Sequence, residues 1–68
     1  MMRISKAEAE AMIDQKEKDS SVKFSNLKRV SATNFTAEMR YLEPAGNIAG
    51  MSVRIECDGI KVIEYLRV

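Results

Sequence analysis

The sequence predicts an α+β fold, in which an N-terminal helix at about residues 5–18 precedes a four-stranded antiparallel sheet, either open or curled into a small barrel. Three observations support this prediction: a helix-capping box at Ser5 and Glu8, a change from helical to strand periodicity after Ser21, and the hairpin dipeptide Asp58-Gly59. With 68 residues, the chain has room for one hydrophobic core. We therefore expect residues 1–68 to form a single small domain, of marginal stability unless a partner adds buried surface.

The predicted helix has a defined start and one apolar stripe. Ser5 and Glu8 form a capping box, in which each side chain accepts a hydrogen bond from the main-chain amide of the other residue. Good helix formers follow without an interrupting Gly or Pro. Ala9, Met12 and Ile13 are spaced so that they lie on one side of the helix, which predicts that this side packs on the sheet.

Alternation of apolar and polar residues predicts the first two strands. The first lies within Val22–Ser31, with a bulge near Asn26, and the second covers Phe35–Leu42 after a turn at residues 32–34. The inward face of the second strand carries Phe35, Ala37, Met39 and Tyr41. The segment Glu43–Gly50 contains the only Pro and two of the three Gly residues of the chain. This composition predicts the longest loop of the protein.

The dipeptide Asp58-Gly59 is the strongest hairpin signal in the chain, because type I′ turns favour it. It lies between two alternating runs, Met51–Cys57 and Ile60–Arg67. They predict the third and fourth strands, with Asp58 and Gly59 as the two turn residues.

That turn would also fix the register of the last two strands. Ile55 would lie opposite Val62 on the buried face, and Ser52 opposite Tyr65 on the outer face. Cys57 would share the buried face with Ile55, so we expect it to be a packed core residue.

The residue types present argue against an enzyme. The chain has no His, which removes the commonest general base and metal ligand, and a single Cys, which excludes an intramolecular disulfide. The sequence contains no phosphate-binding, dinucleotide-binding, calcium-binding or paired-cysteine motif. We therefore expect no catalytic residues, no metal and no cofactor.

Charge and hydropathy indicate a soluble protein, and the single Cys57 indicates a reducing compartment. The formal net charge of +1 gives no strong electrostatic attraction to nucleic acid. The segment between Met1 and Met12 carries charges where a signal peptide needs an apolar stretch, and no apolar run is long enough to cross a membrane. We expect a cytoplasmic protein without membrane contact.

The outer face of the last hairpin is the candidate partner-binding surface. Tyr and Arg beside an aliphatic neighbour are residue types that are enriched at the centre of protein interfaces. An alternative interpretation makes the same side chains a second packing layer, in a barrel or under the helix. The candidate partner-binding residues, including one from the predicted loop, are Arg40, Arg54, Ile63, Tyr65, Arg67 and Ile48.

These observations predict a non-enzymatic interaction module that binds a larger protein through its sheet face, with self-association into a dimer left open. In size and layout the chain resembles small stand-alone accessory proteins of phages and mobile elements, many of which inhibit a host protein. The alternative is a small nucleic-acid-binding module, in which Tyr65 stacks on a base while Arg54, Lys61 and Arg67 contact phosphates.

Overall fold

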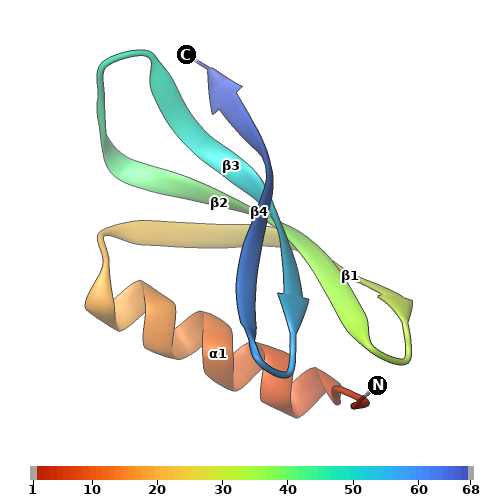
Figure 1. Cartoon of the computed structure of the whole chain (residues 1–68). Helices are drawn as coiled ribbons and strands as arrows, with labels where there is room; N and C mark the ends of the chain where they lie inside the picture. Colours follow the sequence, from red (N-terminus) through yellow and green to blue (C-terminus); the bar gives the residue numbers. More distant parts are fainter. Residues whose placement is uncertain (1, 68) are drawn as a thin grey trace.

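One helix lies beneath a twisted, open sheet of four antiparallel strands in the computed structural model (Figure 1). The model describes residues 2–67, apart from the side chains of residues 44 and 45. The strands follow one another in the sheet in the order β1-β2-β3-β4, so each hairpin joins neighbours. This confirms the α+β prediction in its open form; the sheet does not close into a barrel. The elements are α1 (Lys6–Asp19), β1 (Val22–Ser31), β2 (Asn34–Ala45), β3 (Ile48–Glu56) and β4 (Gly59–Arg67).

The capping box starts α1 as predicted. The Ser5 amide donates to Glu8 Oε1 at 3.0 Å, and the Glu8 amide donates to Ser5 Oγ at 3.1 Å. These two bonds satisfy main-chain donors that would otherwise have no partner at the end of the helix. The hydrogen bonds from Ser5 lower the pKa of the Glu8 carboxyl from its ordinary value, the bond from the main chain having the larger effect.

The predicted apolar stripe of α1 packs mainly against β1. Ala9 is fully buried, and Met12 and Ile13 are half-buried against the same core. The helix also bonds to the strand itself, because Glu17 Oε2 accepts a hydrogen bond from the main-chain amide of Phe24 at 2.9 Å. The Phe24 amide is thus already bonded and cannot donate to a further strand beside β1. In this way α1 covers the outer edge of β1.

The chain before the helix is also part of the core. Ile4 is only 2% exposed, its amide donates to Ala32 O at 3.0 Å, and its carbonyl oxygen accepts from Arg29 at 3.0 Å. The Arg29 guanidinium in turn lies 4.3 Å from the centre of the Phe35 ring. The sequence analysis did not identify Ile4, although an apolar residue just before the capping Ser and a small apolar residue at Ala9 form the pattern of a hydrophobic staple.

The core lies between α1 and the concave side of the sheet, which we call the inner face. Alternate residues of β2 and β3 supply most of it, as expected for a sheet with one buried face. Its buried members are Ile4, Ala9, Val22, Phe35, Ala37, Met39, Met51, Val53 and Ile55.

The predicted bulge near Asn26 is confirmed. The β1–β2 register shifts between Ser25 and Lys28, and Asn26 has a φ of 55°, a conformation that Asn tolerates better than most residues. Asn26 Nδ2 donates to Glu38 Oε2 at 2.6 Å, which holds the bulged residue against the neighbouring strand.

The prediction that Glu43–Gly50 forms a loop is wrong. β2 continues to Ala45 and β3 begins at Ile48, so only Gly46 and Asn47 form the turn, with Gly46 at a φ of +68°. Pro44 does not prevent this extension, because the β2–β3 register is interrupted between Arg40 and Ala45, where no continuous ladder needs its missing N–H.

The predicted register of the last hairpin is also wrong. Glu56 pairs with Gly59, so the turn residues are Cys57 and Asp58, and Ile55 lies opposite Ile60 instead of Val62. This register sets two Ile side chains side by side on the inner face, and that packing outweighs the preference of the dipeptide for the turn. Cys57 is therefore a half-buried turn residue rather than a core residue within a strand.

We expect Ser5→Ala to lower the free energy of unfolding by about 1 kcal/mol at pH 7, because it removes the helix cap. A carboxyl whose pKa is lower in the folded state stabilises the fold above its unfolded pKa, and this contribution is lost as the pH falls through the folded pKa. The advantage of the wild type over Glu8→Ala, which removes the carboxyl that accepts from the Ser5 amide, should therefore be complete above the ordinary value of 4.5 and shrink below it. Urea unfolding at a series of pH values measures both effects; a difference that does not depend on pH would contradict the role of Glu8.

A second prediction concerns Gly50, which the neighbouring strand approaches closely. A Cβ at this position would overlap the main-chain oxygen of Met39 and lie 2.8 Å from the Cα of Arg40. Gly50→Ala should therefore destabilise the fold by about 1–3 kcal/mol, as overpacking does. Ser52→Ala, two residues along the same strand, is the control and should change the thermal midpoint little; equal effects of the two changes would refute the close approach.

Candidate interaction site

The outer edge of β4 is the most accessible hydrogen-bonding edge of the sheet. β4 is the last strand in the sheet order, and within the described part of the chain its outer edge pairs with no other strand. The opposite edge, on β1, is bulged at Asn26 and bonded to Glu17 of α1. The two edges therefore differ, because α1 bonds to the edge of β1 while no described element packs along the outer edge of β4.

Large apolar side chains are exposed along this edge. Val62 is 47% exposed, Ile63 57% and Tyr65 56%, all within one strand of nine residues. Single exposed apolar residues are common, but a group of them on an edge strand is typical of a surface that binds another protein.

A bulge in the middle of β4 determines which way these side chains point. Val53 pairs with Val62, whereas Ser52 pairs with Glu64, so Ile63 is an additional residue on the β4 side. Beyond it Tyr65 pairs with Met51, and directly paired residues of antiparallel strands share a face. Tyr65 therefore lies on the inner face, and the prediction that it pairs with Ser52 on the outer face is wrong.

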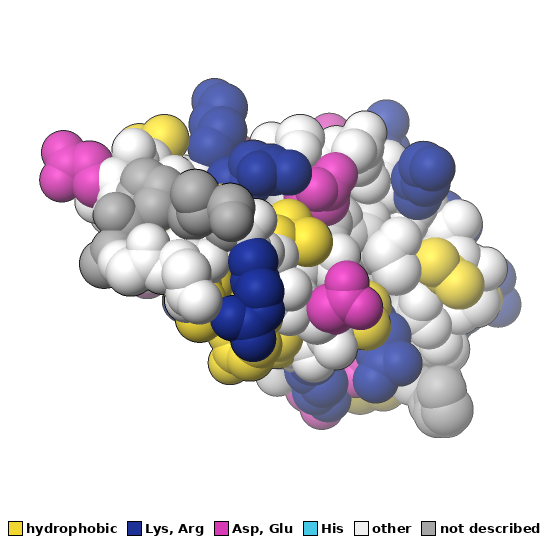
Figure 2. Space-filling model, turned by 90° about the horizontal axis from the view of Figure 1, so that it is seen from above, with side chains coloured by type: hydrophobic (Ala, Val, Ile, Leu, Met, Phe, Trp, Pro, Cys, Tyr) yellow, Lys and Arg dark blue, Asp and Glu magenta, His cyan; other side chains and the backbone are white. Residues whose placement is uncertain are grey.

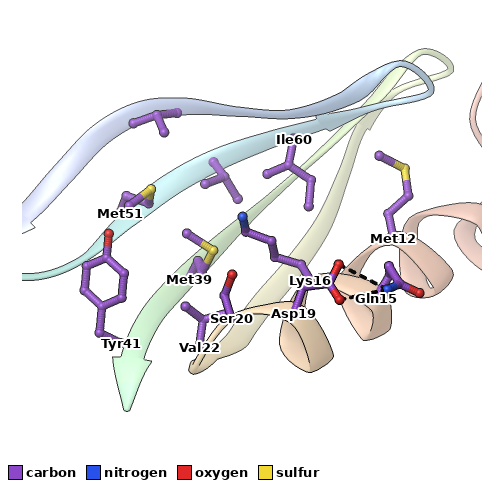
Figure 3. Close-up of a pocket in the computed structure, with 12 residues that line it drawn as sticks. Met12, Gln15, Lys16, Asp19, Ser20, Val22, Met39, Tyr41, Met51 and Ile60 are labelled. Atoms are coloured by element: carbon purple, nitrogen blue, oxygen red, sulfur yellow. Dashed lines mark hydrogen bonds between the residues drawn. The ribbon is translucent and has the colours of Figure 1, made fainter. Parts of the chain in front are cut away.

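A groove lies beside β4, between the C-terminal half of α1 and the inner face of the sheet (Figure 3). Its volume is about 620 Å³, a size typical of sites that bind ligands. Three methionines, Met12, Met39 and Met51, contribute to its walls, and flexible, polarisable Met side chains adapt to irregular apolar partners. The remaining lining residues are Gln15, Lys16, Asp19, Ser20, Val22, Tyr41, Val53, Ile60 and Val62.

The helix supplies the polar side of the groove. Lys16 extends from α1 toward the sheet, so that its ammonium group lies between helix and strands (Figure 3). Gln15 Nε2 donates to both carboxylate oxygens of Asp19, at 3.0 and 3.1 Å. Lys16 forms no ion pair with any residue that the structure describes, so its charge is available to a bound group.

The outer face of the sheet has the opposite character, with basic and acidic side chains interspersed (Figure 2). Arg40 pairs with Glu38 at 3.3 Å, and Arg54 pairs with Glu56 at 3.1 Å. Lys61 Nζ lies 2.8 Å from Glu56. All three ion pairs are largely solvated, so they neutralise this face more than they stabilise the fold.

Lys61 has a second acidic neighbour, since its Nζ also lies 3.2 Å from Asp58 Oδ1. Its hydrogen bonds to Glu56 and then to Asp58 raise the pKa of the Lys61 ammonium group from its ordinary value. The side chain is thereby held on the outer face, close to β3 and the turn.

The structure separates the six predicted partner-binding residues. Arg40 and Arg54 are on the outer face in ion pairs, which places them away from Tyr65. Ile48 is not in a loop but is half-buried in β3, opposite Arg67. The three residues that share the edge strand are Ile63, Tyr65 and Arg67.

The sequence analysis missed the groove, whose main contributors are Met12, Met39 and Met51. The assignment of Met12 to a helix stripe and of Met39 and Met51 to the buried face is confirmed, but periodicity predicts only which side faces the interior, not how far the helix covers it. The concentration of five Met residues in so short a chain was the available signal.

The described residues hold no cluster of three or more Cys, Asp or Glu side chains that could bind a metal ion. α1, the helix of the described chain, is too short and too polar to cross a membrane. Comparisons with protein-family models, curated proteins and solved structures give no match.

The apolar residues of β4 should contribute little to stability, in contrast to those of β3. Ile63→Ala should change the free energy of unfolding by no more than about 0.5 kcal/mol, because Ile63 is mostly exposed. The same change at the fully buried Ile55 should cost about 2–5 kcal/mol. Chemical denaturation of both variants at low protein concentration makes the comparison; a large loss for Ile63→Ala would show that it packs within the fold.

Proposed function

We propose that this protein is a non-enzymatic interaction module that binds an extended segment of a protein partner along the outer edge of β4. The observation that carries the proposal is the accessible β4 edge, with exposed Val62, Ile63 and Tyr65 directly beside an apolar groove. Strand addition at a sheet edge is a recurring way of recognising proteins.

Two kinds of contact would combine in such a complex. Main-chain hydrogen bonds to the β4 edge would supply affinity for any extended segment, and side chains on one side of that segment would enter the groove. Met12 and Met39 can adjust their shape to those side chains, while Lys16 favours a partner with an acidic group nearby.

The electrostatics support a protein partner over nucleic acid. The net charge is +1, and Arg54 and Lys61 are already in ion pairs with acidic residues. The strand register also puts Tyr65 on the face opposite Arg54. Base stacking on Tyr65 and phosphate contacts by Arg54 would therefore need two different faces of the sheet.

Inhibition of a larger protein, as accessory proteins of phages and mobile elements carry out, is one use that fits such an edge. The single Cys57, which lacks an intramolecular disulfide partner, suits a reducing compartment such as the cytoplasm.

Photo-crosslinking in the native cell tests the proposal. A photoreactive phenylalanine analogue in place of Tyr65, which is 56% exposed, should give a covalent adduct with a protein. The same analogue at Leu42 is a matched control, because Leu42 is 64% exposed but lies on β2, away from the edge.

Mass spectrometry of the adducts then separates the hypotheses. Protein adducts at position 65 and few at position 42 would support the β4 edge as the binding site. Equal adducts at both positions, or nuclease-sensitive adducts at position 65, would refute it, the latter in favour of the nucleic-acid alternative.

A further inference from the structure

We propose that the strand that binds β4 is β4 of a second copy of this chain, so that two four-stranded sheets join into one continuous sheet about a two-fold axis. This inference rests on the proposed function and names the partner at the same site. It is carried by the arrangement of charged and apolar residues along β4, which is complementary to itself when one copy is turned antiparallel to the other.

The outer-face charges of β4 match across such an axis. Lys61 pairs with Arg54 and Glu64 pairs with Ser52, which places both on the outer face, on either side of the bulge at Ile63. If the axis passes between Val62 and Ile63, Lys61 of each copy lies opposite Glu64 of the other. Opposite charges directly across an antiparallel ladder stabilise the pairing, and here the pair occurs twice.

The side chains concerned are available for these contacts. Glu64 is exposed and forms no ion pair with any other described residue. Lys61 bonds to Glu56 and to both carboxylate oxygens of Asp58, and in the dimer Glu64 of the other copy would replace the longest of these contacts, at 3.3 Å. The Lys61 side chain is 46% exposed, so a residue of the other copy can reach it.

The apolar residues of β4 match in the same register. Ile60 of each copy lies opposite Tyr65 of the other, and Val62 lies opposite Ile63 of the other. These are the exposed apolar side chains of β4 and a half-buried neighbour at the groove, so the pairing covers them with one another. Aromatic and β-branched residues are favourable cross-strand neighbours.

The charge rows of the whole outer face continue this complementarity. Two rows of paired residues cross the four strands. The first row consists of Lys28, Thr36, Arg54 and Lys61, and the second of Ser25, Glu38, Ser52 and Glu64. In the proposed pairing the basic first row of one copy continues across the interface as the acidic second row of the other copy. Because of the two-fold axis, the acidic row of the first copy likewise continues as the basic row of the second.

The two edges of the sheet limit the assembly to two copies. On the β1 edge the Phe24 amide is bonded to Glu17 and α1 packs against the strand, so this edge is covered where the β4 edge is not. Joining through β4 therefore uses up the accessible edge and gives a closed dimer instead of a growing filament.

A charge-reversal experiment on the full chain tests both the dimer and its register. Sedimentation over a range of concentrations should show a dimer for the wild type. Glu64→Lys and Lys61→Glu should each weaken the homodimer about tenfold or more, because each reversal creates two like-charge pairs across the axis. Mixing the two variants should restore dimerisation, since all four positions then face opposite charges.

Circular dichroism of each variant establishes that it is folded, and Lys28→Glu, on the far edge of the sheet, is the control that should dimerise like the wild type. A wild type that stays monomeric at every concentration, or a dimer that neither variant weakens, would overturn the inference. Protein adducts at position 65 with a different partner would then leave the proposed function standing, whereas the absence of any adduct would remove both.

Discussion

The packing of α1 on one side of the sheet determines most of the rest of this structure. Ala9 and Ile4 anchor the start of the helix in the core, and the bond between Glu17 and the Phe24 amide fixes the helix to β1. Because the helix contacts β1 most closely, the inner face under β3 and β4 is less covered, and the groove lies there. A helix placed centrally would also have covered Val62, which lines the groove and is 47% exposed, and would have left less accessible apolar surface. The off-centre helix thus explains both why one sheet edge is closed and why the other has a binding surface beside it.

The sequence was sufficient for the features that depend on local chemistry. Ser5 and Glu8 fix the start of the helix through bonds between residues three positions apart, and these bonds are present as predicted. The bulge at Asn26 was predictable because Asn tolerates a positive φ, and the alternation of Phe35, Ala37 and Met39 assigned the buried face of β2 correctly. In each case the information lies within a few residues, so tertiary contacts did not need to be known.

The features that the sequence did not reveal depend on contacts between strands. The Asp58-Gly59 dipeptide favours one turn, but the pairing of Ile55 with Ile60 and of Val53 with Val62 moves the turn to Cys57 and Asp58. The additional residue at Ile63 then changes the face on which Tyr65 lies, and no local pattern indicated it. Strand extension through Pro44 was missed for a similar reason, since a break in the ladder removes the need for its amide. The candidate site was therefore predicted on the correct strand but partly on the wrong face.

The bulge at Ile63 divides β4 into two parts. Residues before it, such as Ile60 and Val62, are in phase with β3 and are tied to the core by Ile55 and Val53. Residues after it pair with β3 as they would in a regular ladder, Glu64 with Ser52 and Tyr65 with Met51, so the loss of the Ile63 codon alone would leave both on their present faces. Such a deletion would remove one exposed apolar side chain from the accessible edge, while the helix, the core and the first three strands would keep their structure.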